Sequence, residues 1–163
     1  MRFLEKGKRT ASIPLVQKDT TIEAVLQTLK GSYRHVRYYK SADQSNHWKS
    51  YWTFRTYRTL FEINHTMGFW IDMTAGDNLI VAGLVPETVD IRLYHGWNFV
   101  GYPSFLDRTV DEALRDIDWR MVDGYSDTPP YHLTHLASSD MMTAGEGYWI
   151  WVDLPQIWRF RGT

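Results

Sequence analysis

The chain has 163 residues, which fits one domain or two small ones, and its 44% hydrophobic and 23% charged residues are typical of a folded, soluble protein. It contains no cysteine, so a disulfide framework, a cysteine-ligated zinc site, an iron–sulfur cluster and a thiol nucleophile are all excluded. The net charge is −1, no apolar run approaches the ~20 residues of a membrane helix, and residues 1–12 lack the apolar segment of a signal peptide.

The first half of the chain predicts a short helix followed by strands. The helix has Thr20 or Thr21 as its N-cap, and its apolar side chains recur at helical spacing at Ile22, Val25, Leu26 and Leu29. The other expected elements are a strand over 33–39, a region of irregular pattern, and a hairpin in which 68–73 returns through a turn at 75–78 to 79–82.

The second half predicts the same kinds of element in the same order. They are a β-rich stretch at 92–102, a helix at 109–117, a strand at 120–125, and a closing hairpin of 147–152 with 157–160. A turn is expected at Gly96. Thr109 or Asp107 can cap the helix, whose first turn holds acidic residues.

Matching segments in the two halves indicate an internal duplication. The tetrapeptide GFWI at 68–71 returns as GYWI at 147–150, an offset of 79, and TIEAVL at 21–26 matches TVDEAL at 109–114, an offset of 88. We therefore predict two repeat units, residues 1–85 and 86–163. The expected fold class is α+β, with two strand-rich β-α-β-β-β-like units packed as a pseudo-two-fold pair into one compact body.

The second unit also carries a recognisable signature. It reads L-x-x-GWN-x-VGYPS at 93–104, then V-x-x-AL in the helix, then AGEGYWIWV at 144–152. This resembles a tandem GWN…P / GxGYWI-type repeat of secreted and surface-attached proteins of archaea and bacteria. The resemblance implies an extracellular accessory or interaction module, with no catalytic residues to carry over. The first unit departs from it, because Lys8 and Arg9 stand where Trp97 and Asn98 stand in the second.

Aromatic residues shared by the two units are interpreted as structural. These are Trp70, Trp149, Tyr39 and Tyr125, which we expect in the hydrophobic core. Trp97 and Asn98 are interpreted as a turn pair in which the Asn side chain bonds local backbone, with ligand contact as the alternative.

Functional candidates are instead sought where the units differ. Residues 33–61 alternate aromatic with basic side chains, a pattern that suits sugars, which stack on exposed Trp and Tyr, or single-stranded nucleic acid. The candidate ligand-binding residues are Trp48, Tyr51, Trp52, Arg55 and Tyr57, with Trp97, Asn98 and Tyr131 as secondary candidates. The structural alternative is a half-buried hairpin in which Trp52 and Phe54 face the core.

Charge is divided between the units. Residues 1–85 contain 12 basic and 7 acidic residues, whereas 86–163 contain 6 and 12. This asymmetry suits nucleic-acid binding by the first unit, attraction between the units, or self-association. A hydrolase around His132, His135 and Asp140 is a weaker alternative, since the chain has no nucleophile-elbow, dinucleotide or P-loop motif.

We therefore expect a non-catalytic binding or interaction module whose ligand is a carbohydrate or a protein surface. Single-stranded nucleic-acid binding and hydrolysis stay open as alternatives. No metal site and no cofactor is expected. A cell-surface or secreted location follows only from the resemblance.

Overall fold

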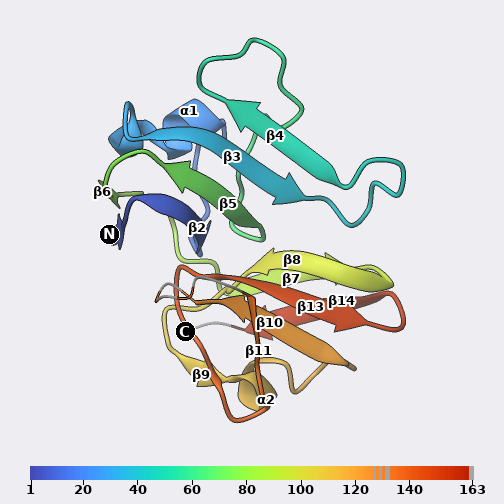
Figure 1. Ribbon diagram of the computed structural model, residues 1–163. Coiled ribbons are helices and arrows are strands. Elements are labelled where there is room, and N and C mark those ends of the chain that lie inside the picture. Colours follow the sequence, from blue (N-terminus) through green and yellow to red (C-terminus); the bar gives the residue numbers. More distant parts are fainter. Residues whose placement is uncertain (127, 129, 131–132, 162–163) are drawn as a thin grey trace.

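The computed structural model describes residues 1–126, 128, 130 and 133–161, and it is made mostly of β-strands (Figure 1). The first half contains β1 (Arg2–Leu4), β2 (Gly7–Ser12), α1 (Ile22–Val25), the 3-10 turn η1 (Gln27–Leu29), β3 (Tyr33–Tyr39), β4 (Trp48–Trp52), β5 (Gly68–Met73) and β6 (Asp77–Leu79). The second half contains β7 (Thr88–Leu93), β8 (Gly96–Gly101), β9 (Arg108–Thr109), α2 (Val110–Ala113), β10 (Met121–Tyr125), β11 (Leu133–His135), β12 (Met141–Met142), β13 (Gly147–Val152) and β14 (Gln156–Arg161).

Each half is built around a four-stranded antiparallel sheet. The strand order is β2-β5-β3-β4 in the first half and β8-β13-β10-β11 in the second. A two-stranded sheet accompanies each, β1-β6 in the first half and β7-β14 in the second, and β9 pairs with β12. Figure 1 shows the first-half sheet above the second-half sheet, so the two halves meet across one boundary.

The predicted closing hairpins are wrong. Three of their four strands exist as β5, β13 and β14, but the strand predicted at 79–82 shares only Leu79 with the observed β6. β5 does not pair with β6, and β13 does not pair with β14. Instead β2 and β5 form a long antiparallel ribbon that bends and continues as β1 and β6, since Gly7 lies opposite Met73 and Leu4 opposite Asp77. β8 and β13 continue in the same way into β7 and β14.

A glycine and a buried polar side chain shape each bend. Gly7 has φ 109° and Gly96 has φ 97°. These positive φ values favour glycine, because glycine has no Cβ to clash with the backbone. After Gly96, the buried Asn98 accepts a hydrogen bond from Tyr94 N and donates to Tyr94 O and Gly96 O, which confirms its predicted bonding to local backbone. In the first half the buried Arg9 guanidinium donates to the Lys6 and Lys8 carbonyls instead.

The helices are shorter than an α+β class implies, so the observed class is mostly β with few helices. α1 and α2 each have four residues, and α1 is followed directly by the 3-10 turn η1. Thr109 caps α2 as predicted, and its side chain and that of Glu112 form a capping box. No helix in the described part of the chain is long and apolar enough to cross a membrane.

Two hydrophobic cores lie on the helix-covered faces of the sheets, one in each half. Side chains alternate along a strand, so Phe69, Ile71 and Met73 of β5 enter the first core while Trp70 and Asp72 lie on the opposite face.

The alternation corrects the prediction that the four shared aromatics are core residues. Those residues, which are all only half-buried, are Tyr39, Trp70, Tyr125 and Trp149. They lie on the sheet faces that point away from the two cores.

The halves meet where β5 and β13 begin. Gly68 and Gly147 face each other so closely that an ideal Cβ on Gly68 would lie 3.1 Å from Gly147 Cα and 2.5 Å from Val100 O. Two backbone hydrogen bonds cross the boundary beside them, Ser12 N to Gly145 O at 2.7 Å and Gly101 N to Thr66 O at 3.0 Å.

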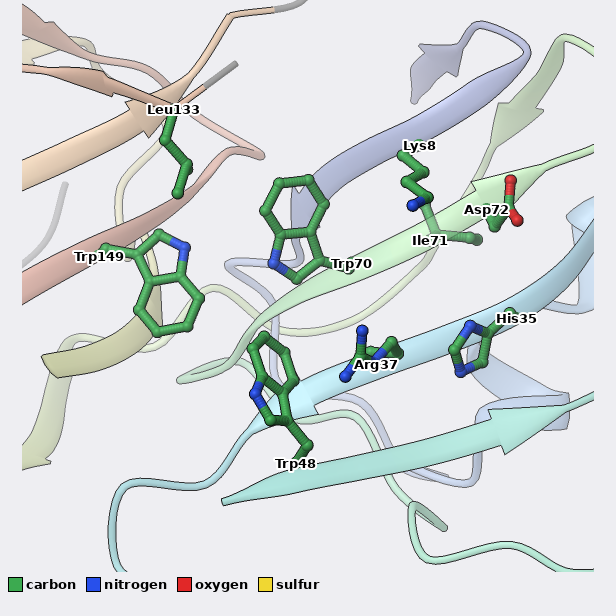
Figure 2. A pocket seen from close by; sticks show the side chains of 9 residues that line it. All are labelled: Lys8, His35, Arg37, Trp48, Trp70, Ile71, Asp72, Leu133 and Trp149. Carbon is green, nitrogen blue, oxygen red and sulfur yellow. The ribbon is translucent and has the colours of Figure 1, made fainter. Parts of the chain in front are cut away.

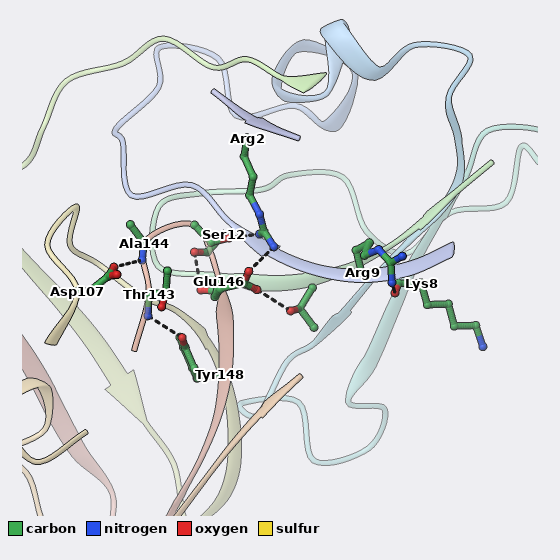
Figure 3. Close-up of polar contacts among 11 residues, drawn as sticks. Arg2, Lys8, Arg9, Ser12, Asp107, Thr143, Ala144, Glu146 and Tyr148 are labelled. Carbon is green, nitrogen blue, oxygen red and sulfur yellow. Dashed lines mark hydrogen bonds and ion pairs between the residues drawn. The ribbon is translucent and has the colours of Figure 1, made fainter. Parts of the chain in front are cut away.

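Side chains add polar contacts at the same boundary (Figure 3). Arg2 pairs with Glu146 and donates to Gly145 O, while Thr10 Oγ1 donates to Glu146 Oε2 at 3.1 Å. Ser12 Oγ donates to Glu146 O at 2.7 Å. The backbones are therefore held in close approach by glycines and by hydrogen bonds from both sides.

Candidate functional site

A cleft of about 340 Å³ opens between the two halves, on the sheet faces that point away from the cores. The described residues that line it are Lys8, His35, Arg37, Trp48, Trp70, Ile71, Asp72, Leu133 and Trp149. Figure 2 shows the indole rings of Trp48, Trp70 and Trp149 grouped at one end and the charged side chains toward the other. Small-molecule sites have volumes of about 300–1,000 Å³, so the cleft has the size of a ligand pocket.

Strand register explains why these residues meet. Lys8 lies opposite Asp72, and Arg37 lies opposite Trp70, in neighbouring strands of the first-half sheet. Trp48 lies opposite Tyr39 at the end of β3. Residues directly opposite each other in antiparallel strands share a face, so the pairing places their side chains on the cleft side.

The aromatic end of the cleft is a network of ring contacts between the halves. The Trp149 ring stacks on Phe99 at 4.6 Å between centroids, and its edge contacts Trp48 at 5.9 Å and Tyr39 at 5.0 Å. Trp70 contacts Tyr125 edge-to-face at 4.9 Å. Each such pair contributes about 0.5–1.5 kcal/mol of stability beyond that of its buried area, so the ring contacts help to hold the aromatic side chains in place.

The charged end is rich in cations. The Arg37 guanidinium carbon lies 4.3 Å from the centroid of the Trp48 ring, a cation–π contact. Asp72 is the one carboxylate among the described lining residues, and it accepts a hydrogen bond from Arg34 Nε at 2.7 Å. Within the described chain, Lys8 and Arg37 have no carboxylate partner.

His35 is neutral in this environment. Burial and the nearby positive charge of Arg37 lower its pKa to about 4. Its ring stacks on Trp52 at 3.5 Å between centroids. The buried His35 Nε2 and Trp149 Nε1 have no hydrogen-bond partner in the described part of the chain. Unsatisfied buried polar groups are uncommon in native structures, so these two atoms are available to a bound water or ligand.

The predicted site residues do not form one surface. Trp48 lines the cleft, but Trp52 lies further along the same sheet face, where Arg55 covers its ring at 4.6 Å. Tyr51 is only 5% exposed and belongs to the first core, whereas Tyr57 is 80% exposed and lies outside the cleft. The alternative hairpin is also reversed, since Tyr51 faces the core and Phe54 is 62% exposed.

The secondary candidates also divide. Trp97 is half-buried and contacts Trp149 and Trp151 edge-on, next to the cleft. Asn98 is buried, and its side-chain amide is hydrogen-bonded to the backbone of the bend at Tyr94 and Gly96. Its side chain is therefore not placed to contact a ligand in the cleft. Tyr131 lies outside the described residues.

Eight of the nine described lining residues were not among the ligand candidates from the sequence. These are Lys8, His35, Arg37, Trp70, Ile71, Asp72, Leu133 and Trp149. The signal that could have found most of them is the two-residue period of each strand, which puts Trp70 in phase with Asp72 and out of phase with the core residue Ile71.

The described residues of the hydrolase alternative, His135 and Asp140, have different hydrogen-bond partners and do not form a catalytic site with each other. His132 lies outside the described residues, His135 Nδ1 lies 2.9 Å from Asp123 Oδ1, and Asp140 Oδ2 accepts from Ala137 N at 2.7 Å within a turn. No group of three potential metal ligands occurs among the residues that the structure describes.

Comparisons with protein-family models, with curated proteins and with solved structures gave no match.

Proposed function

We propose that the protein is a carbohydrate-binding module whose ligand occupies the cleft between the halves. The observation that carries this proposal is the convergence of Trp48, Trp70 and Trp149 on one pocket that also holds Lys8 and Arg37. The apolar C–H faces of a sugar ring stack on indole rings, while charged and polar groups beside them bond its hydroxyls. The proposed role of the cleft is binding.

Single-stranded nucleic acid is less well supported. A strand needs a run of cations along its backbone in addition to stacking platforms. Three of the basic residues in 33–61 are already paired with carboxylates: Arg34 with Asp72, Lys49 with Asp43, and Arg58 with Glu23. The cations left over are few, which favours a small ligand in the cleft over a polyanion along the segment.

The halves are proposed to be duplicated units related by an approximate two-fold axis. Three observations support this: the matching strand order, the matching bends, and the reciprocal hydrogen bonds at the boundary. Adding the sequence offset of 89 to Ser12 and subtracting 79 from Gly145 gives Gly101 and Thr66, the partners in the second hydrogen bond. The resemblance to the GWN…P / GxGYWI-type repeat adds the proposal that the module works at a cell surface or outside the cell.

A printed glycan array tests the proposed function directly. The labelled protein should bind at least one class of glycan. Trp48→Ala should lower that binding about fivefold or more, if a sugar ring gains from one aromatic platform the ~1–3 kcal/mol that a stacked base gains. The control is Tyr57→Ala, an aromatic of the same segment. Tyr57 is 80% exposed and lies outside the cleft, so its loss should leave glycan binding intact.

Two outcomes would contradict the proposal. One is the absence of binding to every glycan on the array by the folded protein. The other is equal loss of binding in the Trp48 and Tyr57 variants at unchanged melting temperature, which would move the site away from the cleft. Retention by single-stranded DNA or by a protein ligand, with no glycan bound, would favour the alternatives instead.

A further inference from the structure

We propose that the carbohydrate ligand carries a carboxylate, held by Arg37 and Lys8 at the charged end of the cleft. The inference rests on the proposed carbohydrate-binding function and adds the chemical class of the sugar, which is a uronic or sialic acid unit. Its physical basis is the charge, the geometry and the position of these two cations.

The charge balance of the cleft favours an anion. Lys8 and Arg37 bring two positive charges, and the carboxylate of Asp72 is already engaged by Arg34. His35 adds no charge near neutral pH, because burial and Arg37 keep its pKa low. An anion entering the cleft would therefore compensate cations that the described chain leaves unpaired.

Arg37 is the cation best suited to a carboxylate. Its guanidinium carbon lies 4.3 Å from the centroid of the Trp48 ring, a cation–π distance, so the side chain has a contact that holds it at the cleft. A planar guanidinium can bind a carboxylate through two parallel hydrogen bonds. Trp48 therefore helps to place the cation that we propose to bind the acidic group.

Lys8 occupies a position that distinguishes the first half from the second. At the equivalent place the second half has Trp97, which packs on Trp149 and Trp151. In the first half this ring is replaced by a flexible ammonium group beside Asp72, on the cleft face of β2. The change removes apolar packing and supplies a cation at the cleft instead.

The test uses the folded protein on pairs of glycans that differ only at the carboxyl group. Uronic-acid and sialic-acid glycans are printed beside their carboxyl-reduced counterparts, and neutral glycans are printed on the same array. The expected result is binding to the acidic glycans and a loss of about tenfold or more on carboxyl reduction, the range for a charge-assisted hydrogen-bond pair. Arg37→Gln and Lys8→Met should each lower binding to the acidic glycans.

Arg55→Gln is the matched control, since Arg55 also covers a tryptophan ring but lies outside the cleft. Equal binding to acidic and carboxyl-reduced glycans would overturn the carboxylate inference and leave the carbohydrate function standing. Binding to neutral glycans alone would do the same. Binding to no glycan would overturn both proposals. Melting curves of each variant separate loss of contact from loss of fold.

Discussion

The close approach of Gly68 and Gly147 makes Gly68→Ala a sharp test of how the halves are joined. A Cβ at this position would lie 2.5 Å from Val100 O and 2.9 Å from Val100 C, which are backbone atoms and cannot rotate away. Overpacking of this kind costs ~1–3 kcal/mol. The new Cβ also reduces the conformational entropy of the unfolded chain, which by itself stabilises the folded protein by ~0.4–1 kcal/mol and offsets part of this cost.

Gly124→Ala is the matched control for this unfolded-state effect. Gly124 also lies in a strand, but a Cβ there would come no closer than 3.4 Å to the side chains of Leu136 and Tyr148. The difference between the two variants therefore isolates the crowding. For a chain of 163 residues, a loss of ~1–3 kcal/mol lowers the melting temperature by ~2–12 °C.

Thermal unfolding and amide hydrogen exchange measure the effect. The Gly68→Ala variant should melt at a lower temperature than the Gly124→Ala variant. In Gly68→Ala, the amides of Ser12 and Gly101, which donate hydrogen bonds across the boundary, should lose more protection from exchange than amides inside either sheet. Equal melting temperatures with unchanged protection of these two amides would refute the close backbone contact between the halves.

Two further predictions concern single side chains. Thr109→Ala should destabilise the protein by ~0.5–2 kcal/mol in denaturant unfolding, because it removes a capping box. Thr21→Ala should cost less, since Thr21 makes no side-chain cap hydrogen bond. Equal losses of stability in the two variants would contradict this prediction. Because the pKa of His35 is lowered from 6.5 to about 4, the unfolded chain binds a proton more readily between these pH values, and stability should fall as the pH drops through this window. His35→Phe keeps a stacked ring that cannot titrate, so its melting temperature should fall less than that of the unchanged protein over the same range, and parallel curves would contradict the buried, neutral imidazole.

Features set by local chemistry could be predicted from the sequence. The strand at 33–39 and the cap at Thr109 match the structure, because each depends on residues close together in the chain. The role of Asn98 is local too, since its hydrogen-bond partners at Tyr94 and Gly96 lie within four residues. Such features follow from propensity and short-range hydrogen bonding.

Strand partners could not be predicted in the same way. A turn after β5 was recognisable, but the strand that follows it was expected at 79–82 instead of Asp77–Leu79, and β6 pairs with β1 instead of β5. The choice of partner depends on the bend at Gly7 and on closure of the whole ribbon, which no short window contains.

The residues that line the cleft could not be separated from core residues by their hydrophobicity alone. Trp70 and Trp149 stand among apolar neighbours and therefore resemble core residues, and Tyr51 stands beside the exposed segment at 53–57 and therefore resembles a surface residue. Only the alternation of faces along each strand, fixed by pairing with distant strands, separates the two groups.

The ribbons that close each half also set the order in which the molecule can be completed during synthesis. All pairing inside the two sheets of the first half lies within residues 2–79, so this half can form while later residues are still being added. The second half closes only with β14, whose pairing with β7 reaches Arg161. Trp149 lies in β13, so the cleft can be complete only after the chain has been synthesised beyond residue 149.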